Sequence, residues 1–594
     1  MKFLKIFAAA LLAVVAGSAV TGILWVMVIA GLAASLEQTP AVPDSSVLVI
    51  DFAEDITDSP QTNPLSHIDV WNLAVQPSLS LYDALKAIDA ACDDNRIKGI
   101  YLRNSGAGSV TAAALEELRA ALDDFRSRSG KEVAAYGETF SQAGYWFATS
   151  ADIIALQPQG AMTWQGLNFT VTFYKGLLDK LDLRAEIFRP TACRYKSAVE
   201  PYFLTRMSDE NRRQMGALAS SMWETILGDV SKARGIEPQV LDALADKLSV
   251  LLPEEALAHG FVDELLYEDE MEELLCSRWG VKRDAGGQLR SISLADYAAG
   301  VMARNAASGN VVAVIYADGD IVDGDGTEDD TVYSRRLSSQ LREARLDDAV
   351  RAVVLRVNSP GGSALAADVI WREAQLLREK KPLIVSMGAY AASGGYYISA
   401  PADVIVADRL SLTGSIGVFG MMFDARGLFN NKLGITFDNV QTNPSADLGS
   451  PVRSMTPAEK AAVMRSVDKV YDTFTHLVAE GRNLPLDKVL DIAGGRVWSG
   501  AAAVEEGLAD ANGGLLMSIA LAADKAALGN DYTVEEFTDE PEGWAALFTA
   551  VSAGLGEQIK PDAADLALRD INTLRRLCDR RGIQTYCPYA IQIE

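Results

Sequence analysis

Apolar and polar positions follow one another along this chain in an order that occurs twice. A run rich in β-branched residues, typical of a buried strand, begins near Ser45 and another near Asn310. Each is followed by the periodicity of an amphipathic helix and by a second buried run, IKGIYLRN from Ile97 and VRAVVLRVNSPGG from Val350. Strands that alternate with helices predict the α/β class, with a mainly parallel sheet and helices packed on its faces.

The later segments of the two runs match as closely. GYWFATSADIIAL aligns without gaps with GYYISAPADVIVA, so that Tyr396 stands 251 positions after Tyr145. MSDENRR and MTPAEKA then each begin a long helical pattern, in the second case with Thr456, Pro457 and Glu459 forming a predicted N-terminal capping box. We interpret the chain as a tandem duplication of one module, with repeats at 46–305 and 306–530 and a C-terminal extension at 531–594.

The N-terminal region predicts one transmembrane helix. No charged residue occurs from Ile6 to Leu36, and about 20 apolar helical residues are enough to span a bilayer core. A cleavable signal peptide is the alternative, with Ala33 and Ser35 as a possible cleavage site, but its apolar region is usually only ~7–15 residues long. We therefore expect an uncleaved anchor at residues 6–36 in contact with the lipid bilayer.

The distribution of basic residues predicts the orientation of that anchor. Lys2 and Lys5 precede it, and no Lys or Arg follows until Lys86. The positive-inside rule leaves the short N-terminus in the cytoplasm and the rest of the chain outside it. Residues 1–45 are therefore expected to be a cytoplasmic tip and anchor, with the folded repeats on the extracytoplasmic side.

Composition narrows the possible functions. The chain has 594 residues and a formal net charge of -26, which opposes binding to a phosphate backbone and makes a nucleic-acid partner unlikely by charge alone. None of its five cysteines forms a Cys-x-x-Cys pair, and neither first strand is followed by Gly-x-Gly-x-x-Gly. We therefore expect no metal and no cofactor. Cys578 and Cys587 are close enough in sequence to pair in an oxidising compartment, although the sequence does not favour it.

The second repeat contains a candidate nucleophile. In the turn AASGGY, Ser393 lies between small residues at a predicted strand-to-helix junction, where a serine hydroxyl can be exposed to substrate. Gly394 follows it and leaves backbone N–H groups accessible to a substrate oxygen. The offset of 251 places Gln142 opposite Ser393, so the first repeat has this turn without the nucleophile.

A glycine-rich turn nearby is a candidate oxyanion hole. NSPGGS follows a buried strand, and its Gly361 and Gly362 allow backbone amides to approach a ligand closely. A tight turn that merely ends the strand is the alternative reading. The presence of Ser393 in the same repeat favours the oxyanion hole.

The general base is predicted to be a lysine. The three histidines, His67, His259 and His476, lie in segments without catalytic character. Lys196 lies just before the first long helix, and alignment on the helix starts places Pro444 opposite it. A single lysine is usually a surface residue. Here, however, one repeat has the lysine without the serine and the other has the serine without the lysine, which predicts one site assembled between them.

Four motifs together resemble a known family. NSPGGS, AASGGYY, SLTGSIGVFG and YKSAVEP, found after an N-terminal anchor, are similar to those of signal peptide peptidase A in its long tandem-repeat form, protease IV. The resemblance implies ClpP/crotonase-like repeats, a nucleophile at Ser393 and a lysine base at Lys196. It also implies a serine endopeptidase that degrades cleaved, hydrophobic signal peptides at the inner (cytoplasmic) membrane, and assembly as a homotetramer.

The predicted chemistry is acyl transfer through an acyl-enzyme. Lys196 must be neutral to accept the proton of Ser393, and burial can lower its pKa from the usual ~10.4 by ~3–5 units. Ser415, in LTGSIG, is a candidate to orient the lysine, and a simple helix-capping role is the alternative. Two other functions are possible. The anchor and the acidic surface oppose a crotonase-type acyl-CoA enzyme, and the Ser/Lys pair opposes a catalytically silent membrane scaffold.

Overall fold

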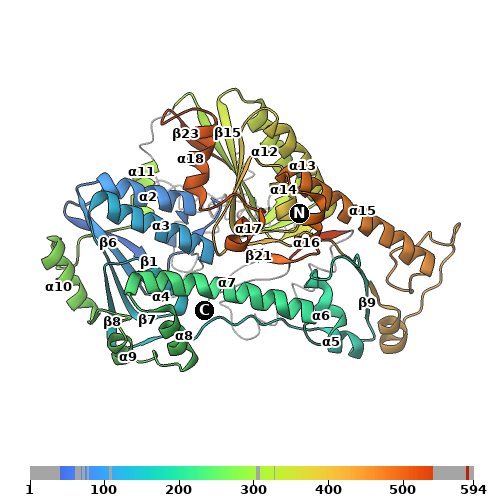
Figure 1. Cartoon of the computed structure of the whole chain (residues 1–594), viewed down its shortest axis with the longest axis horizontal. Coiled ribbons are helices and arrows are strands. Elements are labelled where there is room, and N and C mark those ends of the chain that lie inside the picture. The colour runs from blue at the N-terminus through green and yellow to red at the C-terminus, as the bar shows by residue number, and fades with distance from the viewer. Residues whose placement is uncertain are drawn as a thin grey trace, which may run out of the picture.

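Two sheets lie side by side in the computed structural model (Figure 1). The structure describes residues 41–60, 68–69, 74–75, 79–105, 110–302, 308–326, 328, 330–538 and 583–587. The predicted anchor at 6–36 and Cys578 lie outside these residues. Within them, none of the helices combines the length and apolar character needed to cross a bilayer.

The first sheet has six strands, all paired in parallel, as the alternating pattern predicts. Its three central strands are mostly buried, as expected for strands covered by helices on both faces, whereas the edge strands are partly exposed. Their order across the sheet is β10 (Glu264–Leu265), β8 (Ile153–Met162), β7 (Val133–Phe140), β6 (Ile97–Asn104), β1 (Ser46–Asp51) and β11 (Ser291–Ser293).

The second sheet repeats this order with one strand divided in two. Its path is β21 (Val497–Ser499), β19 (Leu412–Gly414), β17 (Leu383–Ala392), β15 (Val350–Ser359), β12 (Val311–Asp318) and β23 (Thr533–Phe537), with β18 (Val404–Ala407) beside β17 and β22 (Ala511–Asn512) beside β18. β23 belongs to the segment that the sequence assigned to neither repeat. It pairs with β12 as β11 pairs with β1.

Helices cover the sheets and repeat as well. α7 (Asp209–Arg234) and α15 (Pro457–Arg482) each have 26 residues and end at a residue in the left-handed conformation. Thr456 and Glu459 form the predicted capping box of α15. The remaining helices include α2 (Leu81–Asp93), α3 (Ala112–Ser129), α8 (Pro238–Asp246), α9 (Pro253–Ala258), α10 (Glu268–Trp279), α11 (Leu294–Met302), α12 (Ser334–Leu346), α13 (Ala364–Arg378), α16 (Leu486–Ile492), α17 (Gly500–Glu506) and α18 (Leu515–Lys525).

An arm of the first repeat reaches under the second. This first arm, residues 174–205, contains α5 (Lys175–Lys180), β9 (Arg184–Phe188) and α6 (Glu200–Phe203), which Figure 1 shows beside the second repeat. β9 pairs antiparallel with β20 (Gly420–Asp424) of the second repeat. Residues of the first repeat therefore lie against the second repeat.

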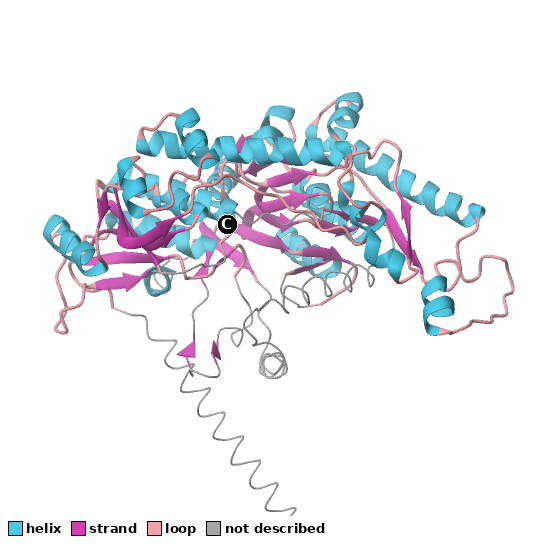
Figure 2. Ribbon diagram, turned by 90° about the horizontal axis from the view of Figure 1, so that it is seen from below, coloured by secondary structure: helices cyan, strands magenta, loops and turns pink. Residues whose placement is uncertain are grey.

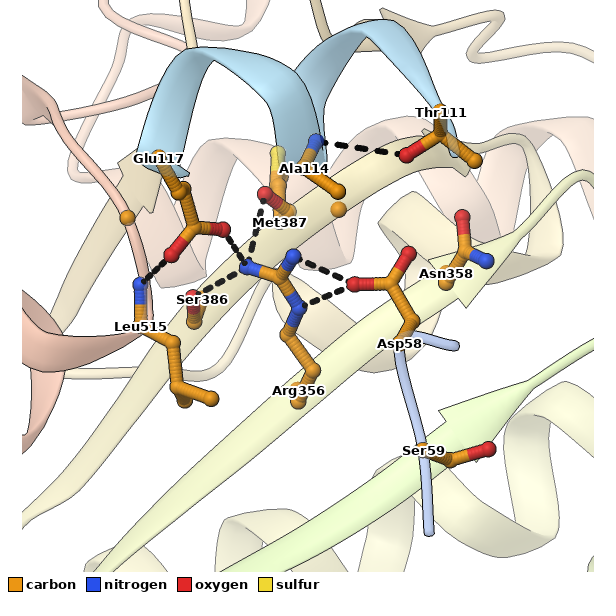
Figure 3. Close-up of polar contacts among 12 residues, drawn as sticks. Asp58, Ser59, Thr111, Ala114, Glu117, Arg356, Asn358, Ser386, Met387 and Leu515 are labelled. Carbon is orange, nitrogen blue, oxygen red and sulfur yellow. Dashed lines mark hydrogen bonds and ion pairs between the residues drawn. The ribbon is translucent and has the colours of Figure 1, made fainter. Parts of the chain in front are cut away.

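A buried ion network also joins the repeats (Figure 3). Arg356 on β15 has no exposed side-chain surface, and its guanidinium lies 2.5 Å from Asp58 and 2.8 Å from Glu117, both from the first repeat. It also donates to Ser386 Oγ, while the backbone N–H of Leu515 donates to Glu117. Buried charges are costly unless paired in this way, so the network fixes the relative position of the two repeats.

Candidate active site

Ser393 lies between β17 and the short helix α14 (Gly394–Ser399). Its side chain is fully buried, and its backbone has φ 57° and ψ −110°, which is unusual for a residue other than glycine. The turn is fixed by hydrogen bonds from Ser393 N to Gly414 O and from Tyr397 N to Ser393 O, each 2.8 Å long. This is the sharp strand-to-helix turn that the sequence predicts, and its strain is typical of functional sites.

Lys196 reaches this turn from the first arm. It precedes the short 3₁₀ helix η1 (Ser197–Val199), and only 1% of its surface is exposed. Its Nζ lies 2.6 Å from Ser393 Oγ and 2.9 Å from Ser415 Oγ. The structure therefore brings together, within one chain, the serine and the lysine that the two repeats contribute separately.

Burial lowers the pKa of Lys196 from 10.5 to about 8. The cause is desolvation, which disfavours the ammonium form, and the thiols of Cys587 and Cys193 oppose it only in part. An amine with this pKa is substantially neutral at slightly alkaline pH and can accept a proton from Ser393.

Ser415 holds the lysine from the opposite side. Lys196 Nζ donates to the Ser415 carbonyl oxygen at 3.1 Å in addition to its contact with the hydroxyl. The backbone of Ser415 has φ 51° and is fixed by a 2.7 Å hydrogen bond from its N–H to Arg496 O. This contact, rather than a helix cap, is what the structure shows for the Ser415 hydroxyl.

The sequence did not identify Gly495, which lets Lys196 fit. Gly495 has φ 82°, and a Cβ built on it would lie 2.5 Å from Lys196 Cβ. Any side chain here would displace the lysine backbone. The pair of glycines that follows α16 was the only signal in the sequence.

The three candidate oxyanion glycines cluster beside Ser393. Gly361 has φ 97°, and a Cβ on it would lie 2.5 Å from Gly394 N. The N–H of Gly361 donates to Ser359 Oγ at 3.2 Å, and Gly362 pairs with Thr585. Within the described residues Gly394 N–H makes no hydrogen bond, so it is the donor most available to a substrate oxygen.

A strand from the C-terminal extension lies next to the dyad. β24 (Gln584–Tyr586) pairs antiparallel with β16 (Gly361–Ser363), and on its other edge Gln584 exchanges two backbone hydrogen bonds with Phe419. Cys587 N donates to Pro360 O at 2.7 Å. An extended chain is thus held on both sides beside Ser393, as a peptide would be held by β-augmentation. No feature of the sequence predicted this contact.

Further short strands extend the small sheet that contains β24, and others lie in the first repeat. β13 (Asp320–Val322) and β14 (Thr331–Tyr333) continue the sheet formed by β16 and β24. Two small ladders lie in the first repeat, β2 (Ile56–Thr57) with β5 (Leu79–Ser80) and β3 (Ile68–Asp69) with β4 (Ala74–Val75).

One similar solved structure is a mutant ClpP1 from Listeria monocytogenes. It is 14% identical, covers 35% of this chain and 94% of that chain, and has a TM-score of 0.23.

Comparison with protein families and curated proteins identifies the family. The model of peptidase family S49 matches residues 126–282 and 375–529, one segment in each repeat. Protease 4 of Salmonella typhi is 38% identical over 78% of this chain and 74% of its own length, and Protease 4 of Haemophilus influenzae is 33% identical over 86% of both. Serine protease SPPA of the Arabidopsis thaliana chloroplast is 31% identical over 75% of this chain and 66% of its own length. The chain belongs to peptidase family S49, as a serine protease of the tandem-repeat protease IV form.

Proposed function

We propose that this chain is a membrane-anchored endopeptidase that degrades cleaved signal peptides with Ser393 as nucleophile and Lys196 as general base. The observation that carries the proposal is the 2.6 Å distance between Lys196 Nζ and Ser393 Oγ, both of which are buried. The two residues come from different repeats, so the fold rather than the local sequence creates the pair.

In the acylation step, neutral Lys196 removes the proton of Ser393 while Oγ attacks the peptide carbonyl carbon. The resulting oxyanion is stabilised by Gly394 N–H, with Gly361 and Gly362 in the facing loop as further donors once they are released from their present partners. Loss of one such donor typically costs ~2.7–4 kcal/mol of barrier.

The C–N bond then breaks, and Lys196 gives its proton to the leaving amine. In deacylation, neutral Lys196 removes a proton from water, which attacks the ester of Ser393. Collapse of that intermediate releases the acid product and returns the proton to Ser393. Ser415 keeps Nζ aligned throughout, since the lysine stem is otherwise flexible.

The surroundings of β24 favour a hydrophobic peptide. The side chain of Tyr586 packs against a small apolar cluster next to the dyad, formed by Ala198, Val199, Phe419, Ile187, Phe203 and Met421. A substrate strand paired with Gly362 and Phe419 would present alternate side chains to this cluster. Such a substrate must first displace β24, because both would pair with the same edges.

The cellular setting is part of the proposal. The apolar segment 6–36 would anchor the chain in the inner membrane with the catalytic repeats on the extracytoplasmic side, and the assembly would be a homotetramer, as the resemblance implies. Residues 6–36 lie outside the described structure, so these statements rest on the sequence.

Labelling of Ser393 tests the proposal. The detergent-solubilised full chain is treated with a fluorophosphonate probe, and the modified residue is located by peptide mass spectrometry. We expect modification at Ser393 that is lost in Ser393→Ala and greatly slowed in Lys196→Ala, together with cleavage of a hydrophobic peptide by the unmodified chain. Failure to label Ser393, or equal cleavage by Ser393→Ala, would overturn the dyad.

A further inference from the structure

The first repeat leaves open a strand edge that the second repeat has covered. In the second repeat this edge is β20, which is paired with β9 of the first arm. The equivalent segment of the first repeat is 169–173, because Thr139 pairs with Ala161 in the same way that Tyr390 pairs with Leu412. Within the described part of the chain, the backbone of 167–173 makes no hydrogen bond to another backbone group.

The side chains of this open edge alternate as in a half-buried strand. Asn168, Thr170 and Thr172 are exposed, whereas Phe169 and Val171 are half-buried. Extended, unpaired backbone with this alternation is a template for pairing with another chain.

The second repeat has an arm of its own, and segment 436–440 of this arm pairs with no strand of the described chain. This second arm, residues 425–456, corresponds to the first arm, and it projects from one end of the molecule in Figures 1 and 2. A left-handed residue ends the helical turn in both arms, Asp182 in the first and Gly434 in the second, which places segment 436–440 opposite β9.

The second arm has the exposure expected of an unused contact surface. Val440 is fully exposed, whereas its counterpart Phe188 is only 5% exposed and belongs to the hydrophobic core of the second repeat. Within the described residues, 436–442 makes no hydrogen bond between backbone groups. Several large apolar side chains of the arm are exposed as well: Leu433, Ile435, Phe437 and Leu448.

We propose that segment 436–440 pairs antiparallel with segment 169–173 of a second copy of this chain. The expected register follows β9 and β20, in which Ile187 pairs with Met421, so that Asn439 would pair with Thr170 of the partner subunit. The unpaired edge and the unpaired arm would then satisfy each other by β-augmentation. The same contact that joins the two repeats within one chain would join neighbouring subunits.

The charges at this contact are complementary. Within the chain, Lys460 on α15 forms a 2.6 Å ion pair with Glu186 on β9. The equivalent positions are Arg212 on α7 and Asp438 on the second arm, which keep the same signs and are both exposed. Among the described residues Arg213 forms an ion pair with Glu210, whereas the structure shows no ion pair for Arg212, so the Arg212 guanidinium is available to Asp438 of the partner subunit.

The proposed contact is heterologous and includes neither Ser393 nor Lys196. Each subunit offers one arm and one edge, so the interface is heterologous, and repetition closes a ring if the rotation allows. The second arm carries Pro444 where the first carries Lys196, and Gln142 occupies the nucleophile position of the receiving repeat. The inference therefore goes beyond the proposed peptidase function and can fail independently of it.

Disulfide trapping tests the register. In the detergent-solubilised full chain, a mixture of Thr170→Cys and Asn439→Cys single variants is oxidised, because residues that pair across antiparallel strands bring their Cβ atoms within reach of a disulfide. We expect covalent dimers containing one of each variant. The matched control replaces Asn439→Cys by Val440→Cys, which faces the other side of the strand, and the unsubstituted chain controls for native cysteines. No dimer, or equal yield with the control, would overturn the proposal.

Charge reversal tests the ion pair. We expect Arg212→Glu to raise the dissociation constant of self-association by about tenfold or more. Analytical ultracentrifugation measures this constant from the mass of the assembly as a function of concentration. Adding Asp438→Arg in the same chain should restore it, whereas Arg213→Glu, a neighbouring exposed arginine, should have little effect. Fluorophosphonate labelling of Ser393 in these variants should persist. Dissociation by Arg213→Glu to the same extent, or no rescue by the double variant, would overturn the proposed contact.

Discussion

The two repeats share a framework and differ in what fills it. Tyr145 Oη donates to Phe261 O in the first repeat, and Tyr396 Oη donates to Leu508 O in the second, each at 2.9 Å. The Arg–Asp pairs that hold the long helices repeat too, as Arg234–Asp263 and Arg482–Asp510. The two repeats thus keep the same framework contacts while carrying different residues at the equivalent sites.

In the first repeat the equivalent site is closed by its own side chains. Gln142 is fully buried, its Oε1 accepts from the backbone N–H groups of Gln165 and Gly166, and its Nε2 donates to Gly166 O. Trp164 stands where the second repeat has Ser415, and it packs against the rings of Trp223, Tyr145 and Phe261. Packing and hydrogen bonds thus fill, in the first repeat, the position that corresponds to Ser393 in the second.

Substitution of Ser393 or Lys196 should have the largest effect on activity, whereas substitution of Gln142, the counterpart of Ser393, should affect only stability. We expect Ser393→Ala and Lys196→Ala each to lower kcat by about 10⁴-fold or more, because members of a catalytic unit cannot replace one another. Gln142→Ala should leave kcat unchanged and reduce stability by ~1–3 kcal/mol, since two backbone donors lose their partner. Steady-state kinetics on a hydrophobic peptide and thermal unfolding measure the two. Loss of activity in Gln142→Ala would show that the first repeat takes part in the chemistry.

The arginines on the equivalent strands β6 and β15 should differ strongly in their effect on stability. Arg356 is fully buried between the repeats, whereas the side chain of Arg103 is 44% exposed and pairs with Asp51 within the first repeat. Arg356→Ala should cost ~3–5 kcal/mol, because it leaves buried carboxylates without a counter-charge. Arg103→Ala should cost about 1 kcal/mol or less, since solvent screens the pair. Denaturant unfolding measures both, and similar costs would contradict the assigned role of the network.

The sequence predicted the contact between Lys196 and Ser393 better than the surroundings of the two residues. The duplication was readable from the repeated segments, and aligning the repeats placed Gln142 opposite Ser393 and Pro444 opposite Lys196, which predicted the two residues as a pair. The parallel sheets followed from the spacing of buried runs. A one-dimensional pattern could not show that β24 returns to pair with β16. Such long-range pairing depends on the tertiary structure that brings the two segments together. The short segment itself has no distinctive periodicity.

The same limit applies to the residues that support the dyad. Ser415 was a candidate because it lies in a glycine-flanked turn, but its contact with Lys196 depends on the first arm crossing to the second repeat. Nothing in the sequence indicates that Gly495 lies against the backbone of Lys196. Local sequence therefore identified reactive groups, while tertiary structure was needed to identify the residues that position them.

Removal of the lysine-positioning contact should have an intermediate effect. We expect Ser415→Ala to lower kcat ~10–100-fold with little change in KM, because Nζ loses its second anchor while the substrate contacts remain. Ser415→Thr should recover part of the loss by restoring a hydroxyl. At the equivalent position of the first repeat, Trp164→Phe should leave kcat unchanged and lower only the unfolding temperature. A fall in stability without a change in kcat for Ser415→Ala would make Ser415 a purely structural residue.

The pH dependence of kcat/KM should reflect the titration of Lys196 and of no group at the equivalent site of the first repeat. Burial lowers the pKa of Lys196 to about 8, and only the neutral amine can accept the proton of Ser393. Activity should therefore rise about tenfold per pH unit below that pKa and level off above it. Measurement of kcat/KM from pH 6 to 10 on the wild type and on Gln142→Ala should give the same limb. A limb near the usual lysine pKa would mean that Lys196 is not desolvated during catalysis.

The smallest effect should come from the strand that covers the catalytic edge of the second repeat. Thr585 pairs with Gly362 through backbone hydrogen bonds, and a substrate strand would use the same edge. Thr585→Pro removes the backbone donor, and a hydrogen bond worth about 1 kcal/mol corresponds to roughly a fivefold lower KM with kcat unchanged. Thr585→Ala keeps the backbone donor and loses only the side-chain bond to Gly362 O, so its KM should fall less. An unchanged or higher KM in Thr585→Pro would mean that peptides enter without displacing β24, and that the second repeat binds substrate along an edge other than β16.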